Sequence, residues 1–219
     1  MYRNMSGNEW ERLNSVNIGV SVEESQEFYR TWADSYNKDC EKLGYTGPKK
    51  VATRVSELFS ECERENIRIL DVGAGTGLVA MELKKLGFEC IHALEPSESM
   101  LLEAMKAGLY KKYFKEFLTE SPTTIPAGSY DIITGCGIYG DDAHVPCEAL
   151  LEMIRLIKPG GYIVLATRNE LVQNNETYKH LEPLMDNIET NGKWKKVSRD
   201  VFPRFNLKKD GIMWCYQVL

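Results

Sequence analysis

The chain has 219 residues, of which 43% are hydrophobic and 27% are charged, and this composition is typical of one globular domain with a sizeable core. Its formal net charge of −5 at pH 7 argues against a broad basic surface, so we expect no nucleic-acid partner. No apolar run approaches the ~18 residues of a membrane span, so we expect no membrane partner either.

The cysteines and the first residues indicate a compartment. Six cysteines are scattered along the chain without a C-x-x-C pair, as free thiols are in a reducing environment. The first residues lack the apolar stretch of a signal peptide. We therefore predict a cytoplasmic protein, with the nucleus as a second setting, and take a monomer as the default.

The N-terminal segment is predicted to end in an aromatic helix. Residues 1–20 show no hydrophobic period and are predicted to form a flexible tail. Ser21 and Glu24 match a capping box, which begins a helix. One face of this helix carries Tyr29, Trp32 and Tyr36. Two interpretations stay open, because such a stripe either packs in the core or closes over a ligand site as a lid.

A second helix is predicted near residues 48–62, where Pro48 suits a first turn. The two helices together make a predicted N-terminal helical cap over residues 21–64. A Rossmann-like core follows at residues 65–219, so residues 21–219 are expected to form a single domain.

A glycine-rich turn lies at the centre of the predicted core, where residues 67–77 read I-R-I-L-D-V-G-A-G-T-G. A short buried strand leads into Gly73, Gly75 and Gly77, and an amphipathic helix follows at residues 78–86. This order turns backbone N–H groups and a helix N-terminus toward a ligand. The third glycine comes one residue earlier than in the dinucleotide fingerprint G-x-G-x-x-G, which disfavours an NAD-dependent oxidoreductase. The alternative is a tight turn without a ligand.

An acidic residue follows the next predicted strand, at residues 89–94. Glu95 comes 22 residues after Gly73, the separation at which a carboxylate meets a bound ribose. Its two oxygens can accept hydrogen bonds from both ribose hydroxyls. The alternative is a solvated carboxylate at a strand end.

The rest of the chain continues the alternation of strands and helices. Further strands are predicted near residues 113–118, 130–136, 162–167, 194–202 and 212–219, and further helices near 97–107, 145–157 and 174–190. This order predicts an α/β fold with a doubly wound open sheet. Ligands of such sheets bind outside the carboxyl ends of the strands, which would bring Asp71, Glu95, Gly135 and Cys136 around one crevice.

The motif D-x-G-x-G-x-G at residues 71–77 resembles the first motif of class I S-adenosylmethionine-dependent methyltransferases. Four further segments, F-Y-R-T-W-A-D-S-Y-N-K-D, D-V-G-A-G-T-G-L-V-A, H-V-P-C-E-A-L-L-E-M and I-K-P-G-G, together resemble the Williams–Beuren syndrome critical-region methyltransferase-like family over roughly residues 28–218. The resemblance implies a seven-stranded sheet with its last strand antiparallel. It also implies S-adenosyl-L-methionine as cofactor and S-adenosyl-L-homocysteine as product.

The resemblance also implies roles for individual residues. Asp71 and the glycines would contact the methionine part of the cofactor, Glu95 the ribose, and Leu118 and Thr119 the adenine. The predicted cofactor-binding residues are Trp32, Tyr36, Asp71, Gly73, Ala74, Gly75, Gly77, Glu95, Pro96, Ser97, Met100, Leu118, Thr119, Gly135 and Cys136.

The acceptor and the catalytic residue are less defined by the sequence. His144, which follows the fourth strand, is the best-placed candidate for a general base, and the alternative is a structural or solvent-facing histidine. Asp141 and Asp142 would suit Mg²⁺, but no further ligand accompanies them, so we predict no metal. We expect methyl transfer to a small molecule. A protein side chain is the second candidate acceptor, and a catalytically silent cofactor-binding module is the other alternative.

Overall fold

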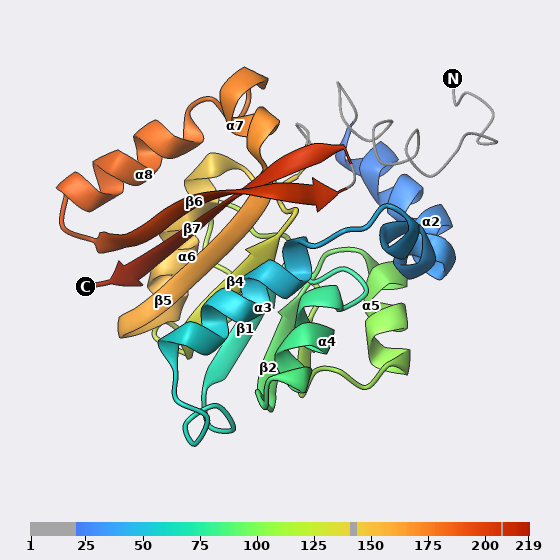
Figure 1. The fold of residues 1–219 in the computed structure, drawn as a ribbon, viewed down its shortest axis with the longest axis horizontal. Coiled ribbons are helices and arrows are strands. Elements are labelled where there is room, and N and C mark those ends of the chain that lie inside the picture. The colour runs from blue at the N-terminus through green and yellow to red at the C-terminus, as the bar shows by residue number, and fades with distance from the viewer. Residues whose placement is uncertain (1–20, 141–143, 207) are drawn as a thin grey trace.

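The computed structural model describes residues 21–140, 144–206 and 208–219, and these form one mixed sheet with helices on both faces (Figure 1). Seven strands lie in the order β3-β2-β1-β4-β5-β7-β6. Strands β1 to β5 pair in parallel, and β7 runs antiparallel to both β5 and β6. The strands are β1 Arg68–Val72, β2 Cys90–Leu94, β3 Lys112–Phe114, β4 Tyr130–Cys136, β5 Ile157–Arg168, β6 Trp194–Asn206 and β7 Lys209–Val218. The predicted seven-stranded α/β sheet with its last strand antiparallel is therefore confirmed.

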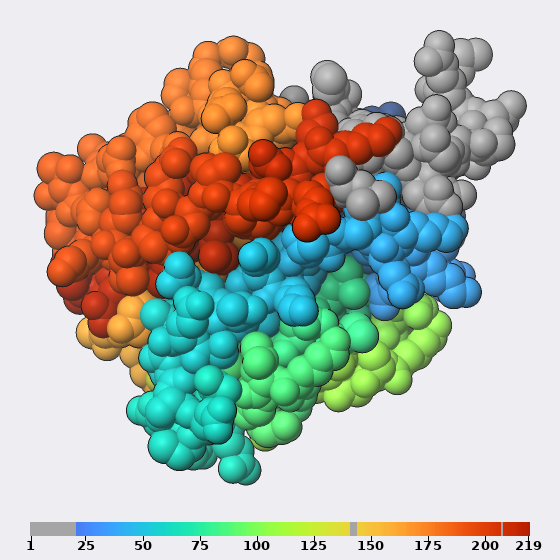
Figure 2. Space-filling model, in the orientation of Figure 1, coloured from blue at the N-terminus to red at the C-terminus, as the bar shows by residue number. Residues whose placement is uncertain are grey.

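The helices divide between the two faces of the sheet. Apolar side chains of α3, α4 and α5 pack on one face, and those of α6, α7 and α8 pack on the other. Figure 2 shows α3 and α4 side by side over the first face. The helices are α2 Val22–Lys42, α3 Gly47–Leu58, α4 Leu78–Lys85, α5 Glu98–Lys106, α6 Leu150–Leu156, α7 Asn169–Asn174 and α8 Leu181–Thr190, with a 3-10 turn η1 at Cys147–Ala149.

The aromatic residues of helix α2 do not join the apolar cluster of either layer, but α2 contacts α5 of the first layer (Figure 1). The predicted capping box begins it, since the Glu24 backbone N–H donates to Ser21 Oγ and the Ser21 N–H donates to the Glu24 carboxylate. Within the described part of the chain, no helix has the length and apolar character needed to cross a membrane. The predicted tail at residues 1–20 lies outside the described residues, and the division into a cap and a core stays a prediction.

The third strand was predicted too late in the chain. We expected it near residues 113–118, but it spans Lys112–Phe114. Its length is limited by its neighbour, because β2 ends at Leu94, which pairs with Phe114. Glu95 then donates its backbone N–H to the Phe114 carbonyl and leaves the sheet. Beyond Phe114 the chain has no strand to pair with.

The helix predicted at residues 174–190 is confirmed in part, because α8 ends at Thr190 as predicted but begins only at Leu181. Residues 175–180 are not helical, and they separate α7 from α8. Pro183 lies in the first turn of α8, where a backbone N–H has no partner within the helix, so it does not interrupt the helix. The helix predicted at 145–157 is shorter, because the 3-10 turn η1 precedes α6. Strand β5 begins earlier than predicted, at Ile157, with an irregular register before Tyr162.

Candidate functional site: two adjoining cavities at the carboxyl edge of the sheet

The glycine turn after β1 needs glycines for two different reasons. Gly73, Gly75 and Gly77 all have positive φ, at +58°, +54° and +95°, where other residues are strained. A Cβ on Gly73 would lie 2.6 Å from Ile138 Cγ2, and one on Gly77 would lie 2.5 Å from Leu109 Cδ1, so both positions are closely packed. A Cβ on Gly75 would meet nothing within 4 Å. Gly75 therefore leaves open space at the turn, as a ligand-binding backbone requires.

Glu95 ties this turn to the start of α5. Its Oε2 accepts a hydrogen bond of 2.9 Å from the Gly75 N–H, and its Oε1 accepts one of 2.8 Å from the Ser97 N–H. Burial raises the pKa of Glu95, although the two backbone hydrogen bonds act in the opposite direction. Each carboxylate oxygen keeps a further lone pair, so Glu95 can still accept hydrogen bonds from a ligand.

Asp71 lies beneath the turn and does not line a cavity. Its Oδ2 accepts a hydrogen bond of 2.7 Å from the Tyr110 hydroxyl, and its Oδ1 accepts one of 2.9 Å from Thr134 Oγ1. Burial raises the pKa of Asp71 to about 7, despite these two bonds. In this position the carboxyl group joins β1, β4 and the segment before β3, and it contacts neighbours rather than open space.

A cavity opens beside the turn, and we call it the glycine-loop cavity. Its walls come from the ends of β1, β2 and β4, from α2, and from the segment after β3. Eight of the predicted cofactor-binding residues line it, namely Tyr36, Gly73, Gly75, Glu95, Pro96, Met100, Leu118 and Cys136. Six others lie outside its lining, namely Asp71, Ala74, Gly77, Ser97, Thr119 and Gly135, and Trp32 lines a neighbouring cavity. Their proposed contacts with a cofactor stay predictions.

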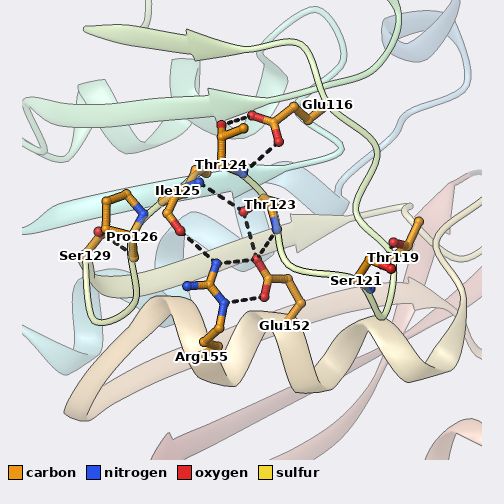
Figure 3. Close-up of polar contacts among 10 residues, drawn as sticks. All are labelled: Glu116, Thr119, Ser121, Thr123, Thr124, Ile125, Pro126, Ser129, Glu152 and Arg155. Atoms are coloured by element: carbon orange, nitrogen blue, oxygen red, sulfur yellow. Dashed lines mark hydrogen bonds and ion pairs between the residues drawn. The ribbon is translucent and has the colours of Figure 1, made fainter.

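The wall near Leu118 is held in place by helix α6. The buried Glu152 carboxylate accepts two hydrogen bonds of 2.8 Å from Thr123, one from its backbone N–H and one from its hydroxyl (Figure 3). Arg155 donates to the same carboxylate and, at 2.7 Å, to the Ile125 carbonyl. Burial acts to raise the pKa of Glu152, but the bonds from Arg155 and Thr123 outweigh it and lower the pKa. This network fixes a segment that has no strand partner.

A second cavity adjoins the first, and we call it the aromatic cavity. Most of its lining residues carry rings or apolar groups, with a few polar side chains between them. The lining comprises Tyr29, Trp32, Tyr36, Cys40, Leu43, Tyr45, Gly137, Tyr139, Gly140, His144, Thr167, Arg168, Phe205 and Asn206. Sequence reasoning did not select Tyr139, Arg168 or Asn206. The position of Arg168 at the carboxyl end of β5 was a usable signal, whereas Asn206 had none.

The two cavities share one boundary. Tyr29, Tyr36, Gly137 and His144 line both of them. At this boundary the Tyr29 hydroxyl and His144 Nε2 share a hydrogen bond of 2.8 Å. The His144 ring also lies against Gly140, where a Cβ would come within 3.1 Å of it. The structure thus brings His144, the candidate base, to the junction, while Asp141 and Asp142 lie outside the described residues.

Helix α2 covers the boundary with its aromatic side chains. Phe28 and Trp32 are buried against Tyr29 and Tyr36, in a cluster separate from the apolar clusters on the two sheet faces. The Trp32 indole N–H donates to Asp39 Oδ2 at 2.8 Å, within the same helix. Tyr29 and Tyr36 of the stripe therefore line both cavities and Trp32 lines the aromatic cavity, but movement of α2 as a lid stays a prediction.

Comparison with known proteins agrees with this geometry. A family model described as "Methyltransferase domain" matches residues 43–202. The chain is 35% identical over 169 residues to human methyltransferase-like protein 27, and the match covers 77% of this chain and 67% of the human protein. Two solved structures share the fold. An S-adenosylmethionine-dependent methyltransferase of Leishmania major has a TM-score of 0.64 and 21% identity over 89% of this chain and 82% of its own. A Thermotoga maritima enzyme described as a possible histamine N-methyltransferase has a TM-score of 0.58 and 20% identity. The match covers 87% of this chain and 97% of that enzyme.

The fold and the glycine turn define an α/β enzyme with the architecture of the S-adenosylmethionine-dependent methyltransferases. The family match covers well over half of the chain. The chain belongs to the methyltransferase domain family, and it is a methyltransferase of that family.

Proposed function

We propose that this methyltransferase uses S-adenosyl-L-methionine and transfers its methyl group to a small molecule held in the aromatic cavity. The observation that carries the proposal is the shared boundary. Two cavities of different character meet at Tyr29, Tyr36, Gly137 and His144, so a cofactor in one and an acceptor in the other would be in contact. The similarity to human methyltransferase-like protein 27, a Williams–Beuren region protein, supports the resemblance seen in the sequence motifs.

The residues of the glycine-loop cavity fit this cofactor. Gly75 leaves space that a Cβ would fill, Glu95 offers carboxylate lone pairs for ribose hydroxyls, and Met100 and Leu118 supply apolar walls for a base. When bound, S-adenosyl-L-methionine supplies an electrophilic methyl group on a positively charged sulfur. Tyr29 and Tyr36 of α2 line the boundary and pack against the buried Phe28 and Trp32, so we expect them to exclude water and strengthen electrostatic interactions there.

His144 is placed to accept a proton from an acceptor hydroxyl or amine at the boundary. Its ring is held by the Tyr29 hydroxyl and by contact with Gly140, so its orientation is set before an acceptor binds. Holding the acceptor beside the cofactor also lowers the entropic part of the barrier. A small molecule is favoured over a protein side chain because aromatic side chains line the aromatic cavity, with α2 along one wall.

Calorimetry tests the cofactor assignment directly. The protein should bind S-adenosyl-L-homocysteine and S-adenosyl-L-methionine, and at ~100 times the dissociation constant either ligand should stabilise the fold by about 2.7 kcal/mol. NAD serves as the control ligand and should have no effect. Tight binding of NAD without binding of S-adenosyl-L-homocysteine would refute the proposal.

The role of His144 is tested separately. His144→Ala should lower methyl transfer about a hundredfold or more, while affinity for S-adenosyl-L-homocysteine changes little. His180→Ala is the matched control, since His180 is exposed at the start of α8 and lines neither cavity. Equal turnover in the two variants would leave His144 without a catalytic role. Cofactor binding without turnover of any acceptor would favour the silent module.

A further inference from the structure

We propose that the aromatic cavity binds a small hydroxylated aromatic carboxylate, whose carboxylate group is held by Arg168, Asn206 and Tyr139 at the end remote from His144. This inference rests on the proposed methyl transfer and adds the chemical class of the acceptor. It follows from two buried polar groups without partners, one buried cation, and the rings that surround them.

Arg168 brings a positive charge to the cavity. It is the last residue of β5, and only 6% of its surface is exposed. Its Nη1 lies 3.6 Å from Glu170 Oε1, and Glu170 also forms an ion pair with Lys209. A guanidinium has five N–H donors in a planar fork, so it can contact Glu170 and a ligand carboxylate at the same time.

Two neutral polar groups lie beside this charge without partners of their own. The Tyr139 hydroxyl and Asn206 Nδ2 have no hydrogen-bond partner among the described residues, although Tyr139 is 1% and Asn206 is 2% exposed. Both residues line the aromatic cavity. Buried polar groups are nearly always hydrogen-bonded, so two unpartnered groups on residues that line one cavity point to a ligand that supplies the acceptors.

A bulge in β6 places Asn206 at the cavity. The register of β6 against β7 shifts between Phe202 and Asn206, and Arg204 has a positive φ of 57°. Such a conformation is costly for a non-glycine residue and persists where neighbours fix it. Here Thr46 fixes it, since its hydroxyl donates to the Arg204 carbonyl at 2.6 Å and its N–H donates to the Phe205 carbonyl at 2.9 Å. Bulges of this kind re-aim side chains beside functional sites.

The donors among the described lining residues suit an anion of low charge. Among the described residues that line the aromatic cavity, none is acidic, and Arg168, Asn206 and Tyr139 all offer donors. One guanidinium and two neutral donors suit the two oxygens of a carboxylate, whereas a phosphate dianion would bring a second charge into a buried place. The rings of Trp32, Tyr45 and Phe205 form walls that suit a flat aromatic body.

The position of these groups orients the acceptor. Arg168, Asn206 and Tyr139 line the aromatic cavity but not the glycine-loop cavity, whereas His144 lines both. A carboxylate held at the first three directs the opposite end of the ring to the boundary. In the transfer, the acceptor hydroxyl oxygen forms a bond to the methyl carbon and the sulfur–methyl bond breaks with its electron pair staying on sulfur. The hydroxyl proton passes to His144.

The test uses the full chain saturated with S-adenosyl-L-homocysteine. Hydroxybenzoates with the hydroxyl at each ring position are titrated by calorimetry, beside their methyl esters and the corresponding hydroxyphenyl phosphates. At least one hydroxybenzoate should bind at least about tenfold more tightly than its ester, because a charge-assisted hydrogen bond is lost in the ester. It should also bind more tightly than the phosphate and become methylated on oxygen in the presence of S-adenosyl-L-methionine.

Several outcomes would overturn the inference. If acid and ester bind equally, or the phosphate binds best, then the carboxylate assignment fails. If S-adenosyl-L-homocysteine binds and no hydroxybenzoate does, the inference fails while the proposed function stands. If S-adenosyl-L-homocysteine itself does not bind, the proposed function has failed, and the two results are thereby distinguished.

Variants separate ligand binding from structure. Tyr139→Phe deletes a buried hydroxyl that has no partner, so the melting temperature should stay equal or rise while carboxylate affinity falls several-fold. Arg168→Gln should lower that affinity at least about tenfold and remove the preference for the acid over its ester. Arg68→Gln is the matched control, because Arg68 is exposed at the opposite end of the sheet. Should Arg168→Gln fail to fold, Tyr139→Phe decides: a loss of stability with unchanged affinity would show the hydroxyl to be structural.

Discussion

The glycine-loop cavity and the aromatic cavity meet at four residues, yet the chain makes them in different ways. The first is built largely from the ends of neighbouring parallel strands and from the backbone of one glycine turn. The second is built from side chains of α2, the turn before α3, the loop after β4, the end of β5 and the bulge of β6. The family match at residues 43–202 includes the glycine turn, but it excludes α2 and the residues that follow 202.

The two cavities differ in how much of their lining lies outside the residues that match the family model. Tyr29, Trp32 and Tyr36 precede the matched range, and Phe205 and Asn206 follow it. Both groups line the aromatic cavity. The glycine turn and the strand ends that would hold a common cofactor thus lie within the matched range, although α2 adds one wall. The part that would choose an acceptor combines Tyr139 and Arg168 of the matched range with residues from the two segments outside it.

The largest expected effect on cofactor affinity comes from Gly75→Ala in the glycine-loop cavity. Because its Cβ would enter the open space at the turn, affinity for S-adenosyl-L-homocysteine should fall about ten- to hundredfold. Gly87→Ala is the control, since Gly87 also has a positive φ and open space around it but lies after α4. Both variants should lose about 1–2 kcal/mol of stability from left-handed strain. Equal affinity in both, measured by calorimetry, would mean that no ligand approaches this turn.

A somewhat smaller effect is expected for Glu95→Gln. The change removes the charge that holds the Gly75 and Ser97 N–H groups, so cofactor affinity should fall about tenfold. Glu98→Gln makes the same charge change three residues later, at a side chain that is 71% exposed and paired with Lys115. The affinity of Glu98→Gln for the cofactor should match that of the unmodified protein. If the two variants bind alike, Glu95 only ties the turn to α5.

Hydrogen exchange sharpens the comparison at the boundary of the two cavities. Helix α2 has its own aromatic cluster, separate from the clusters on the sheet faces, so we expect it to gain protection when S-adenosyl-L-homocysteine binds. Helix α3 is the internal control, because Val51, Ala52 and Val55 pack in a sheet-face cluster and should be protected in both states. Equal protection of residues 22–42 with and without ligand would make α2 a permanent part of the core.

The smallest effect on cofactor affinity is expected for Asp71→Asn. The pKa of Asp71 is about 7 in the folded chain, against about 3.9 for an unperturbed aspartate. Between about pH 3.9 and pH 7, the folded state keeps the proton on the Asp71 carboxyl group, whereas the unfolded state has released it. This contribution to stability is therefore fully present below about pH 4 and is lost as the pH rises through 7.

The asparagine of the variant does not titrate. The free energy of unfolding of the variant should therefore fall less between about pH 4 and 8 than that of the unmodified protein. The difference in slope should reach about 1.4 kcal/mol per pH unit within that interval. Denaturant unfolding at several pH values measures it, and calorimetry should find cofactor affinity nearly unchanged. Parallel pH profiles would show that Asp71 is ionised in the folded state.

The strand and helix order was predictable because local patterns carried it. The capping box at Ser21 and Glu24, the glycine turn and the acid at Glu95 each depend on residues close in sequence. The errors arose where a distant neighbour decided the outcome. Strand β3 ends at Phe114 because β2 ends at Leu94, and no pattern within residues 110–118 records that limit.

The residues of the candidate site also divide into those that a local sequence pattern predicts and those that distant contacts bring to the site. Tyr36, Glu95 and Cys136 were selected from the sequence, and all three line the glycine-loop cavity. Arg168 and Tyr139 were not selected, although Arg168 ends β5 and Tyr139 follows β4, and the carboxyl ends of both strands meet at that edge. Asn206 reaches the aromatic cavity only because a bulge in β6 is fixed by Thr46, which lies 160 positions earlier in the chain.

The sequence by itself determined the open α/β sheet and the glycine turn, because strand periodicity and positive φ are properties of short segments. Only the tertiary structure decided which side chains line the aromatic cavity and where His144 lies. The Tyr29–His144 hydrogen bond joins residues 115 positions apart, and the unpartnered groups of Tyr139 and Asn206 are recognisable only once burial is known. Burial and contact between distant segments depend on how the layers pack, and no local pattern encodes them.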